Sequence, residues 1–332
     1  MTNLANYLSV FLREYLPCDR GSSQHTCETY AYTFQLLVCF VAHQAKTKPS
    51  KLTIEFLNAP MIITFLNHLE KERSNSASTR NARLTAIKAF FRFLEYRIPS
   101  CLDQARRIHA IPSKKISCKL IDYLTQQEMQ VLLDTPDIRK PYGIRDRAMI
   151  YLAYAAGLRV SELIGLRIDQ LNFRPDPVIK ICGKGRRERV IPLWKETTIA
   201  LRAWIAVRTK AMIIPELFLN SQDNPITRSG FEYILSKHVE IATSKQPSLS
   251  EKRISPHVLR HTCAMHTLQA TGDIRKVSLW LGHADLKSTE IYLRADPSEK
   301  LEALMAGNPL SIQRGKFKAP DKLLAMLSLN NR

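Results

Sequence analysis

The chain has 332 residues, which corresponds to about two domains, and 45% of them are hydrophobic, as in an ordinary globular protein. The longest apolar run, residues 148–158, is much shorter than the roughly 20 residues that span a bilayer, and no secretory signal is recognisable, so we expect no membrane role. The seven cysteines are scattered and include no CxxC pair, which argues against a disulfide framework or a zinc ribbon and favours a reducing cytoplasm.

Basic residues predominate along the whole chain. Lys and Arg number 49 against 30 Asp and Glu, for a net charge of +19, and both halves of the sequence carry the excess. A chain that is basic throughout is typical of a protein that clamps a long polyanion, and nucleic acid is the usual partner of this kind. The alternative from composition alone is a soluble protein that happens to be basic.

The first hundred residues show helical periodicity. Asn58 is placed to cap a helix that has Pro60 in its first turn, and a further helix follows Ser78. This second helix has an apolar stripe formed by Leu84, Ile87, Phe91 and Leu94, and a neighbouring polar stripe formed by Asn81, Thr85, Lys88 and Arg92. Such a polar stripe can contact phosphates and base edges in a DNA groove, although an ordinary solvated helix face has the same pattern.

The segment that follows has a different composition. Residues 98–123 contain Pro99 and Pro112, repeated Lys and Arg and no sustained periodicity, so we predict a basic interdomain linker at 101–123. Thr125 and Glu128 then match a capping box, which predicts that a second domain begins with a helix at about residue 126.

The second domain is predicted to be mixed. A helix from about residue 144 to 156 ends at Gly157, and a mostly helical pattern returns from Arg202. Between them, two β-prone runs at 178–182 and 190–193 flank the glycine-rich basic segment 183–187, which predicts a β-hairpin. The sequence therefore predicts a mostly α protein with a small β-sheet, built as a clamp of two domains.

Two segments of this domain combine Arg, Glu and His. Arg159 begins a helix and Glu162 lies one turn on, where it can orient the guanidinium, although such pairs are usually surface ion pairs. His257 and Arg260 share a helix face, so that both can meet one anion. His257 and His261 have the i, i+4 spacing of zinc ligands, but no H-E-x-x-H pattern is present, and we expect His261 to be a buried histidine that braces its helix.

A third segment places a histidine before a tyrosine. Gly282 ends a helix and leaves His283 at a turn, and Tyr292 follows nine residues later. Alone, Tyr292 would be read as a packing residue. Together with Lys184 on the predicted hairpin, these groups suit phosphodiester chemistry, because Arg stabilises phosphoryl oxygens, His and Lys move protons, and Tyr can be a covalent nucleophile.

Two kinds of phosphodiester enzyme lack support in the sequence. No cluster of Asp and Glu is recognisable that could hold two Mg²⁺ ions, and no G-x-x-x-x-G-K-[ST] motif indicates an ATP-driven motor. We therefore expect neither a metal site nor a cofactor.

As a set, these segments resemble the catalytic domain of the tyrosine recombinase (phage integrase) family, which includes the Xer and Cre recombinases. The matching text is AGLRVSEL at 156–163, GKG at 183–185, HVLRHT at 257–262, LGH at 281–283 and IY at 291–292, all in the family's order. The N-terminal helix after Ser78 is similar, more loosely, to the family's SAM-like core-binding domain.

The resemblance implies a role for each matching residue. Tyr292 would attack the scissile phosphate to form a 3′-phosphotyrosyl bond, while Arg159 and Arg260 would hold its nonbridging oxygens. Lys184 would protonate the leaving 5′-oxygen, His257 would assist proton transfer at the nucleophile, and His283 would hydrogen-bond the phosphate. Glu162 and His261 would hold these catalytic side chains in place, and Arg186 and Arg187 on the hairpin would contact DNA.

The resemblance also implies an organisation and partners. It divides the chain into a core-binding domain (1–100), the linker (101–123), a catalytic domain (124–305) and a C-terminal tail (306–332) that docks on a neighbouring protomer or folds back on its own domain. It leaves no room for a separate arm-binding domain. The partners would be double-stranded DNA with inverted-repeat core sites, a tetramer of the chain on that DNA, related recombinases and accessory DNA-bending proteins, in a bacterial cytoplasm.

The expected function is site-specific DNA recombination through a Holliday junction, as the integrase or transposase-like recombinase of a mobile element. Three alternatives remain at this point: an Xer-like resolvase of chromosome or plasmid dimers, a type IB topoisomerase, and a DNA-binding clamp with no catalytic activity.

Overall fold

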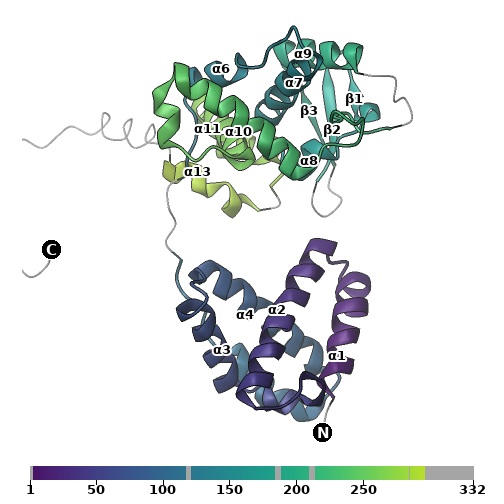
Figure 1. The fold of residues 1–332 in the computed structure, drawn as a ribbon, viewed down its shortest axis with the longest axis vertical. Helices are drawn as coiled ribbons and strands as arrows, with labels where there is room; N and C mark the ends of the chain where they lie inside the picture. The colour runs from purple at the N-terminus through teal and green to yellow at the C-terminus, as the bar shows by residue number, and fades with distance from the viewer. Residues whose placement is uncertain (1–2, 117–120, 184–187, 209–213, 284, 296–332) are drawn as a thin grey trace, which may run out of the picture. The chain divides into compact units, whose positions relative to one another are not determined.

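The computed structural model describes residues 3–116, 121–183, 188–208, 214–283 and 285–295. Residue contacts divide the chain into two units, Met1–Cys118 and Lys119–Arg332. Within the described residues the chain is mostly helical with one small antiparallel sheet, which confirms the predicted fold class (Figure 1). None of the described helices is long and apolar enough to cross a membrane.

The N-terminal unit is a bundle of helices whose starts are fixed by polar side chains. Ser23, Asn58 and Ser76 each accept a hydrogen bond from a backbone N–H in the first turn of the following helix. The helices are α1 (Leu4–Val10), the π-helical η1 (Phe11–Asp19), α2 (Gln24–Gln44), the 3-10 turns η2 (Pro49–Lys51) and η3 (Ile54–Phe56), α3 (Ala59–Lys71), α4 (Ala77–Glu95), the 3-10 turn η4 (Pro99–Cys101) and α5 (Leu102–His109).

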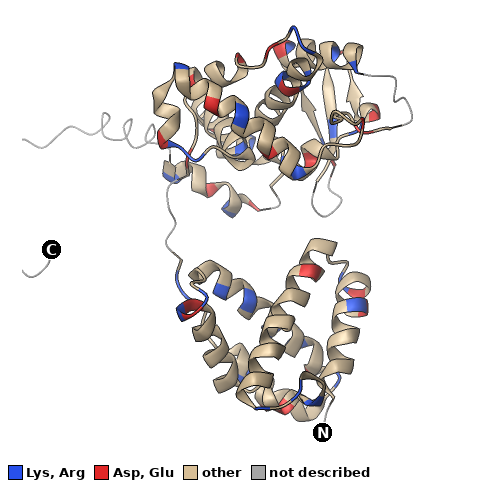
Figure 2. Ribbon diagram, in the orientation of Figure 1, with Lys and Arg blue, Asp and Glu red and all other residues tan. Residues whose placement is uncertain are grey.

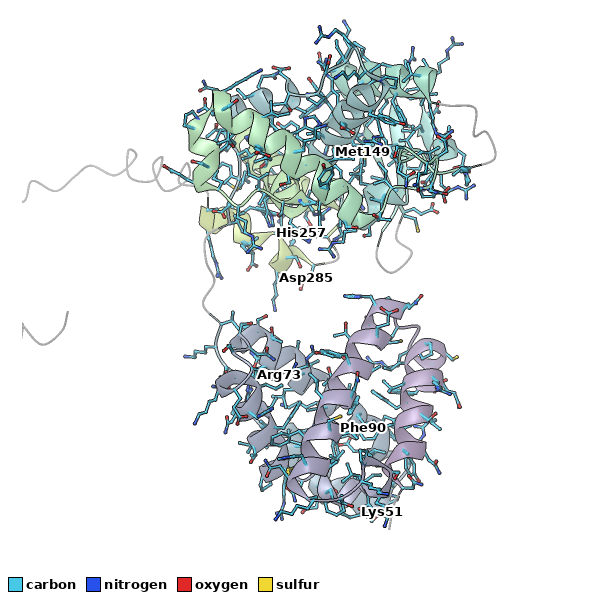
Figure 3. The ribbon with its side chains drawn as sticks, in the orientation of Figure 1. Lys51, Arg73, Phe90, Met149, His257 and Asp285 are labelled. Carbon is cyan, nitrogen blue, oxygen red and sulfur yellow. The ribbon has the colours of Figure 1, made fainter. Side chains whose placement is uncertain are left out.

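Aromatic rings fill the centre of this bundle. The ring of Phe90 on α4 lies 5.3 Å from that of Phe11 and 5.1 Å from that of Phe34, and all three side chains are buried (Figure 3). Burial of three such rings removes a large apolar area from water, so the aromatic cluster contributes to the stability of the bundle.

The structure differs from the predicted linker over its first part. Residues 102–109 form α5, and Ala105, Ile108 and Ile111 are buried in the core of the N-terminal unit. Arg106 and Arg107, two of the basic residues that suggested a linker, lie on the exposed side of this short amphipathic helix, and its apolar side packs against α3 and α4. The N-terminal unit therefore extends beyond residue 100.

The polar stripe on α4 is partly occupied by contacts within the protein. The Lys88 ammonium donates to the carbonyl oxygens of His109 (2.9 Å) and Ile111 (2.6 Å), at the end of α5. Asn81 accepts from the backbone N–H of Lys114 and donates to its carbonyl oxygen. Thr85 and Arg92 are exposed, so these two remain the better placed of the four predicted DNA contacts.

The C-terminal unit combines helices with a three-stranded sheet in the order β1-β2-β3. Its elements are α6 (Gln126–Leu133), α7 (Pro141–Ala155), α8 (Val160–Ile164), η5 (Ile168–Gln170), β1 (Leu171–Asn172), β2 (Val178–Cys182), β3 (Glu188–Pro192), α9 (Lys195–Val207), α10 (Arg228–Lys245), η6 (Pro247–Glu251), α11 (Pro256–Thr271), α12 (Ile274–Leu281), η7 (Leu286–Ser288) and α13 (Glu290–Ala295). The predicted hairpin is present as β2 and β3, with Ile179 opposite Ile191, and the two-residue β1 was not predicted.

Helix α7 is the centre of the second core. It is buried along most of its length, including Met149, and packs against α9 and α11 (Figure 3). Thr125 and Glu128 form the predicted capping box at the start of α6. Just before it, the backbone of Leu124 is held by α11, because its N–H donates to Thr262 and its carbonyl oxygen accepts from His266.

Lys and Arg are distributed over both units (Figure 2). The predicted C-terminal tail, 306–332, lies outside the described residues, as do Lys184, Arg186 and Arg187 on the hairpin.

Lys88 and Arg92 allow a test of which part of the polar stripe supports the fold. Lys88→Met leaves two carbonyl oxygens at the end of α5 without their charged donor, so we expect a loss of about 1–3 kcal/mol in the free energy of unfolding. Arg92→Met on the same stripe should change it by less than about 0.5 kcal/mol. Urea unfolding of both variants without DNA measures the difference, and equal stability would contradict a structural role for Lys88.

Candidate active site

One buried carboxylate organises the centre of the C-terminal unit. The side chain of Glu162 on α8 is 4% exposed. Its Oε1 accepts from Nη1 of Arg159 (2.8 Å) and Nη1 of Arg189 (3.1 Å), and its Oε2 accepts from the backbone N–H of Arg159 (2.9 Å) and Nη2 of Arg189 (2.8 Å). Burial alone raises the pKa of a carboxyl group, but the hydrogen bonds from Arg189 and Arg159 outweigh it and hold the pKa of Glu162 below its ordinary value.

Arg260 reaches the same carboxylate from α11. Its Nη1 lies 3.9 Å from Oε2 of Glu162 and donates to the carbonyl oxygen of Gly157, at the end of α7, while Nη2 donates to that of Leu281 at the end of α12 (2.8 Å). Burial, together with the nearby charge of Arg159, lowers the pKa of Arg260 to about 10, so the guanidinium stays charged at neutral pH.

The two arginines differ in what they offer to a ligand. Arg260 is almost fully buried and held by three protein oxygens. The Arg159 side chain is 31% exposed, and within the described residues only its Nη1 has a protein partner. The pair therefore presents a fixed positive charge with N–H donors left over, which is the arrangement that holds a phosphoryl group.

Gly157 is required at this position for two reasons. Its φ of +56° is in the left-handed region, and a Cβ there would lie 2.6 Å from Cδ2 of Leu281 and 3.1 Å from Sγ of Cys263. The glycine lets the end of α7 approach α11 and α12 closely enough for its carbonyl oxygen to meet Arg260.

Tyr292 lies in this site but is buried. It is 2% exposed, and its hydroxyl is 3.0 Å from Nδ1 of His261. Burial raises the pKa of Tyr292 to about 12, although Arg260 and Arg159 act in the opposite direction. Burial, with His257 and Arg260, lowers the pKa of His261 to about 4. At neutral pH the phenol is therefore protonated and the imidazole beside it is uncharged.

This contact changes the interpretation of two histidines. His261 was expected to brace its helix and to support the catalytic groups, and among the described residues it is the histidine that meets the hydroxyl of Tyr292. His257, on the preceding turn of α11, has a pKa below its ordinary value because of partial burial and the charges of Arg228, Arg260 and Arg159. The predicted part of His257 in proton transfer remains a prediction.

His283 lies beside the nucleophile candidate at the turn after α12. Its Nδ1 is 2.7 Å from Oγ1 of the buried Thr289, and its ring is parallel to that of Tyr292 with centroids 6.5 Å apart. Burial, followed by the charges of Arg260, Arg159 and Arg189, lowers its pKa to about 4. With Nδ1 fixed by Thr289, the other ring nitrogen is left for a ligand.

The base of the hairpin borders the same site. A cavity of about 210 Å³ is lined by Gly183, Glu188, Arg189, Ser278, Leu279, Gly282 and His283. Lys184, the next residue after Gly183, lies outside the described residues, so its predicted role is not tested. Among the described residues there is no group of three His, Cys, Asp or Glu side chains that could hold a metal ion.

Arg189 was not predicted to be a site residue. It lies on β3 on the same side as the buried Ile191, and its side chain is only 11% exposed. An arginine at an inward-facing position of a strand is a signal of a buried ion pair, because an unpaired charge is not stable there. The alternation of β3 could have indicated this, but the partner, Glu162, is 27 residues away in sequence.

Comparisons with known proteins identify the family of the chain. A family model described as the phage integrase family matches residues 122–299, and one described as the phage integrase N-terminal SAM-like domain matches residues 11–97. The chain is 39% identical to the putative integrase/recombinase y4rC of Sinorhizobium fredii, over 98% of each chain. It is 30% identical to the tyrosine recombinase XerD of Haemophilus influenzae, over 92% of this chain and 97% of that one. The chain belongs to the phage integrase family.

Solved structures show the same fold as this recombinase. The integrase of the Tn1549 transposon, in complex with transposon right end DNA, has a TM-score of 0.70 at 18% identity and covers 92% of this chain and 99% of that one. The XerH site-specific recombinase, bound to a palindromic difH substrate, has a TM-score of 0.67 at 22% identity and covers 89% and 84%.

The lowered pKa values of two histidines in the site predict that the recombinase loses stability in mild acid. His261 and His283 have pKa values of about 4 when folded and about 6.5 when unfolded, so between these values the unfolded chain binds more protons. The free energy of unfolding should fall as the pH drops from 6.5 to 5, above the range in which Glu162 is protonated. Urea unfolding at several pH values should show a flatter profile for the His261→Gln, His283→Gln double variant than for the wild type, and an unchanged slope would contradict these assignments.

Proposed function

We propose that this recombinase cuts and rejoins specific DNA sites by attack of Tyr292 on the scissile phosphate. The phenol oxygen forms a bond to phosphorus, the 5′-oxygen of the next nucleotide leaves, and a 3′-phosphotyrosyl bond results. Attack by a 5′-hydroxyl on that bond reverses the reaction and joins a new strand. The observation that supports this most directly is the convergence of Arg159 and Arg260 on Glu162, with Tyr292 in contact with His261, the residue next to Arg260.

The arginines would carry most of the electrostatic stabilisation. Negative charge on the nonbridging oxygens grows at a position fixed by Arg159 and Arg260, whose own positions are fixed before DNA binds. Preorganised charges of this kind lower a barrier without a reorganisation cost during the reaction. His283 would donate to the same phosphate, and His257 would assist proton transfer near the nucleophile.

Tyr292 cannot react from the position seen in the structure. A side chain that is 2% exposed and hydrogen-bonded to His261 has no access to a phosphate in a DNA duplex. In the proposed reaction, α13 shifts on DNA binding so that the phenol leaves the core of the unit and meets the phosphate held by Arg159.

The wider function would be the movement of a mobile element in a bacterial cytoplasm. Four copies of the chain would exchange strands at inverted-repeat core sites through a Holliday junction, with related recombinases or DNA-bending proteins as further partners. The similarity to the integrase/recombinase y4rC over nearly the whole chain supports this role. The similarity to XerC and XerD proteins supports the second candidate, resolution of chromosome or plasmid dimers.

Covalent trapping tests the nucleophile. With a duplex nicked near the cleavage position, the short 5′-hydroxyl fragment diffuses away and the covalent adduct accumulates. We expect a slowly migrating adduct on a denaturing gel with the wild type and none with Tyr292→Phe. The matched control is Tyr154→Phe, which removes another buried hydroxyl, one held by His266, and should still form the adduct.

The DNA chosen for this assay separates the candidate functions. Fragments from the ends of the element that encodes the protein should give the adduct, whereas adducts formed only on a chromosomal dimer-resolution site would favour the Xer-like role. Salt-sensitive binding with no adduct on any fragment would contradict catalysis and favour a DNA-binding clamp.

A second experiment tests Lys184 as the general acid. Lys184→Ala should slow cleavage of an ordinary phosphodiester by about 10²–10⁴-fold. A substrate with sulfur in place of the bridging 5′-oxygen has a leaving group that needs no proton, so the variant should cleave it at nearly the wild-type rate. An equal loss on both substrates would exclude Lys184 from this role.

A further inference from the structure

Arg189 is a nearly buried arginine whose guanidinium is directed toward the carboxylate of the site. Its side chain is 11% exposed, compared with 31% for Arg159, and both of its terminal nitrogens are directed to Glu162. Because Arg159 binds the same carboxylate, Arg189 can act on Arg159 through Glu162.

The contact between Arg189 and Glu162 fixes the plane of the carboxylate. Nη1 of Arg189 donates to Oε1 and Nη2 donates to Oε2, at 3.1 and 2.8 Å, so the two groups meet in a parallel fork. The terminal torsion of a glutamate side chain is otherwise broad. With Arg189 in place, both oxygens are held at defined positions.

Arg159 depends on those two positions at the same time. Oε2 accepts from its backbone N–H, at the start of α8, and Oε1 accepts from its Nη1. A rotation of the carboxylate would break one of these bonds or both, and the guanidinium of Arg159 would lose its orientation. Glu162 thus transmits the geometry of β3 to the arginine that faces the ligand.

The charge of Arg189 also supports Glu162. The hydrogen bond from Arg189 is the largest influence that lowers the pKa of the buried carboxyl, while the same charge contributes to lowering the pKa of Arg260. A lysine at this position would supply the charge without the fork, so the specific contribution of the arginine is one of geometry.

Gly282 leaves the space that Arg189 needs. A Cβ on Gly282 would lie 2.8 Å from Cδ and 3.0 Å from Nη1 of Arg189, and the φ of Gly282 is +63°. The turn that carries His283 thus packs directly on the Arg189 side chain, so the same arginine connects β3, α8 and the end of α12.

We propose that Arg189 is a positioning residue, which holds Glu162 so that Arg159 meets the nonbridging oxygens of the scissile phosphate in the productive orientation. This inference rests on the proposed function. It connects β3 mechanically to the two arginines of the site through Glu162.

The first experiment measures single-turnover cleavage at saturating DNA. Arg189→Met should reduce the rate by about 100-fold, the loss expected for a misplaced catalytic group, while the DNA dissociation constant changes less than about threefold. Arg189→Lys keeps the charge but cannot form the fork, and should recover only part of the rate. The control is Arg167→Met, which breaks an exposed ion pair with Asp169 in the same unit and should cleave at the wild-type rate.

A change in the substrate separates positioning from a general effect on folding. A methylphosphonate at the scissile position lacks the charge of one nonbridging oxygen, so its cleavage depends less on Arg159. The ratio of the wild-type rate to the Arg189→Met rate should therefore fall at least tenfold on this substrate. Equal ratios on both substrates would show that Arg189 supports only the fold and would overturn the proposal.

A double-variant cycle gives an independent test. If Arg189 acts through Arg159, then Arg189→Met should cause little further loss of cleavage rate in an Arg159→Met background, and multiplicative losses would contradict the proposal.

Arg189→Lys replaces Arg189→Met in both tests if the methionine variant does not fold. Absence of any wild-type adduct would refute the proposed function itself, whereas wild-type cleavage with unaffected Arg189 variants would refute only this inference.

Discussion

The active site depends on the burial of one negative charge. Glu162 is almost completely removed from water, and a carboxylate in that environment is stable only if charged donors satisfy its oxygens. The donors come from α8 and β3, with Arg260 of α11 close by, so these three elements have to pack together for the charge to be tolerated. The buried carboxylate needs charged donors, and this need brings the arginines together in a single site.

Helix α11 connects this site to the rest of the C-terminal unit. Successive residues of a helix point in directions about 100° apart, so Arg260, His261 and Thr262 reach three different neighbours. Arg260 meets the ends of α7 and α12, His261 meets Tyr292 on α13, and Thr262 holds the backbone of Leu124 before α6. Because one rigid helix makes all these contacts, a displacement at any of them also displaces the arginines of the site.

The parts of the structure that are determined locally could be predicted from the sequence. Asn58 and the Thr125–Glu128 capping box mark helix starts through bonds within one turn, and Gly282 ends α12 through its own backbone conformation. Contacts between distant residues could not be predicted in this way. Nothing in the sequence around Arg189 indicates Glu162 as its partner.

The dependence on contacts between distant residues also explains why α5 and the contact of His261 were not predicted. The eight residues of α5 carry too few apolar positions to show a sustained period, and the helix is recognisable only by its packing on α3 and α4. His261 has the spacing of a zinc ligand and the surroundings of a core histidine, yet its contact is with the hydroxyl of Tyr292, 31 residues away. Residue type and spacing thus select the candidate groups, whereas their pairing is a property of the tertiary structure.

The electrostatics of the site have a consequence for the proposed reaction. Burial and the charges of nearby arginines lower the pKa values of His261 and His283 to about 4, so these two rings do not readily accept a proton at neutral pH, and the pKa of His257 is also below its ordinary value. A phosphate between Arg159 and Arg260 brings negative charge to the same place, and an opposite charge nearby raises the pKa of a histidine. The histidines would therefore become better proton acceptors at the moment when Tyr292 has to lose its proton, and the phosphate itself would switch the site from a state that holds the phenol proton to one that can remove it.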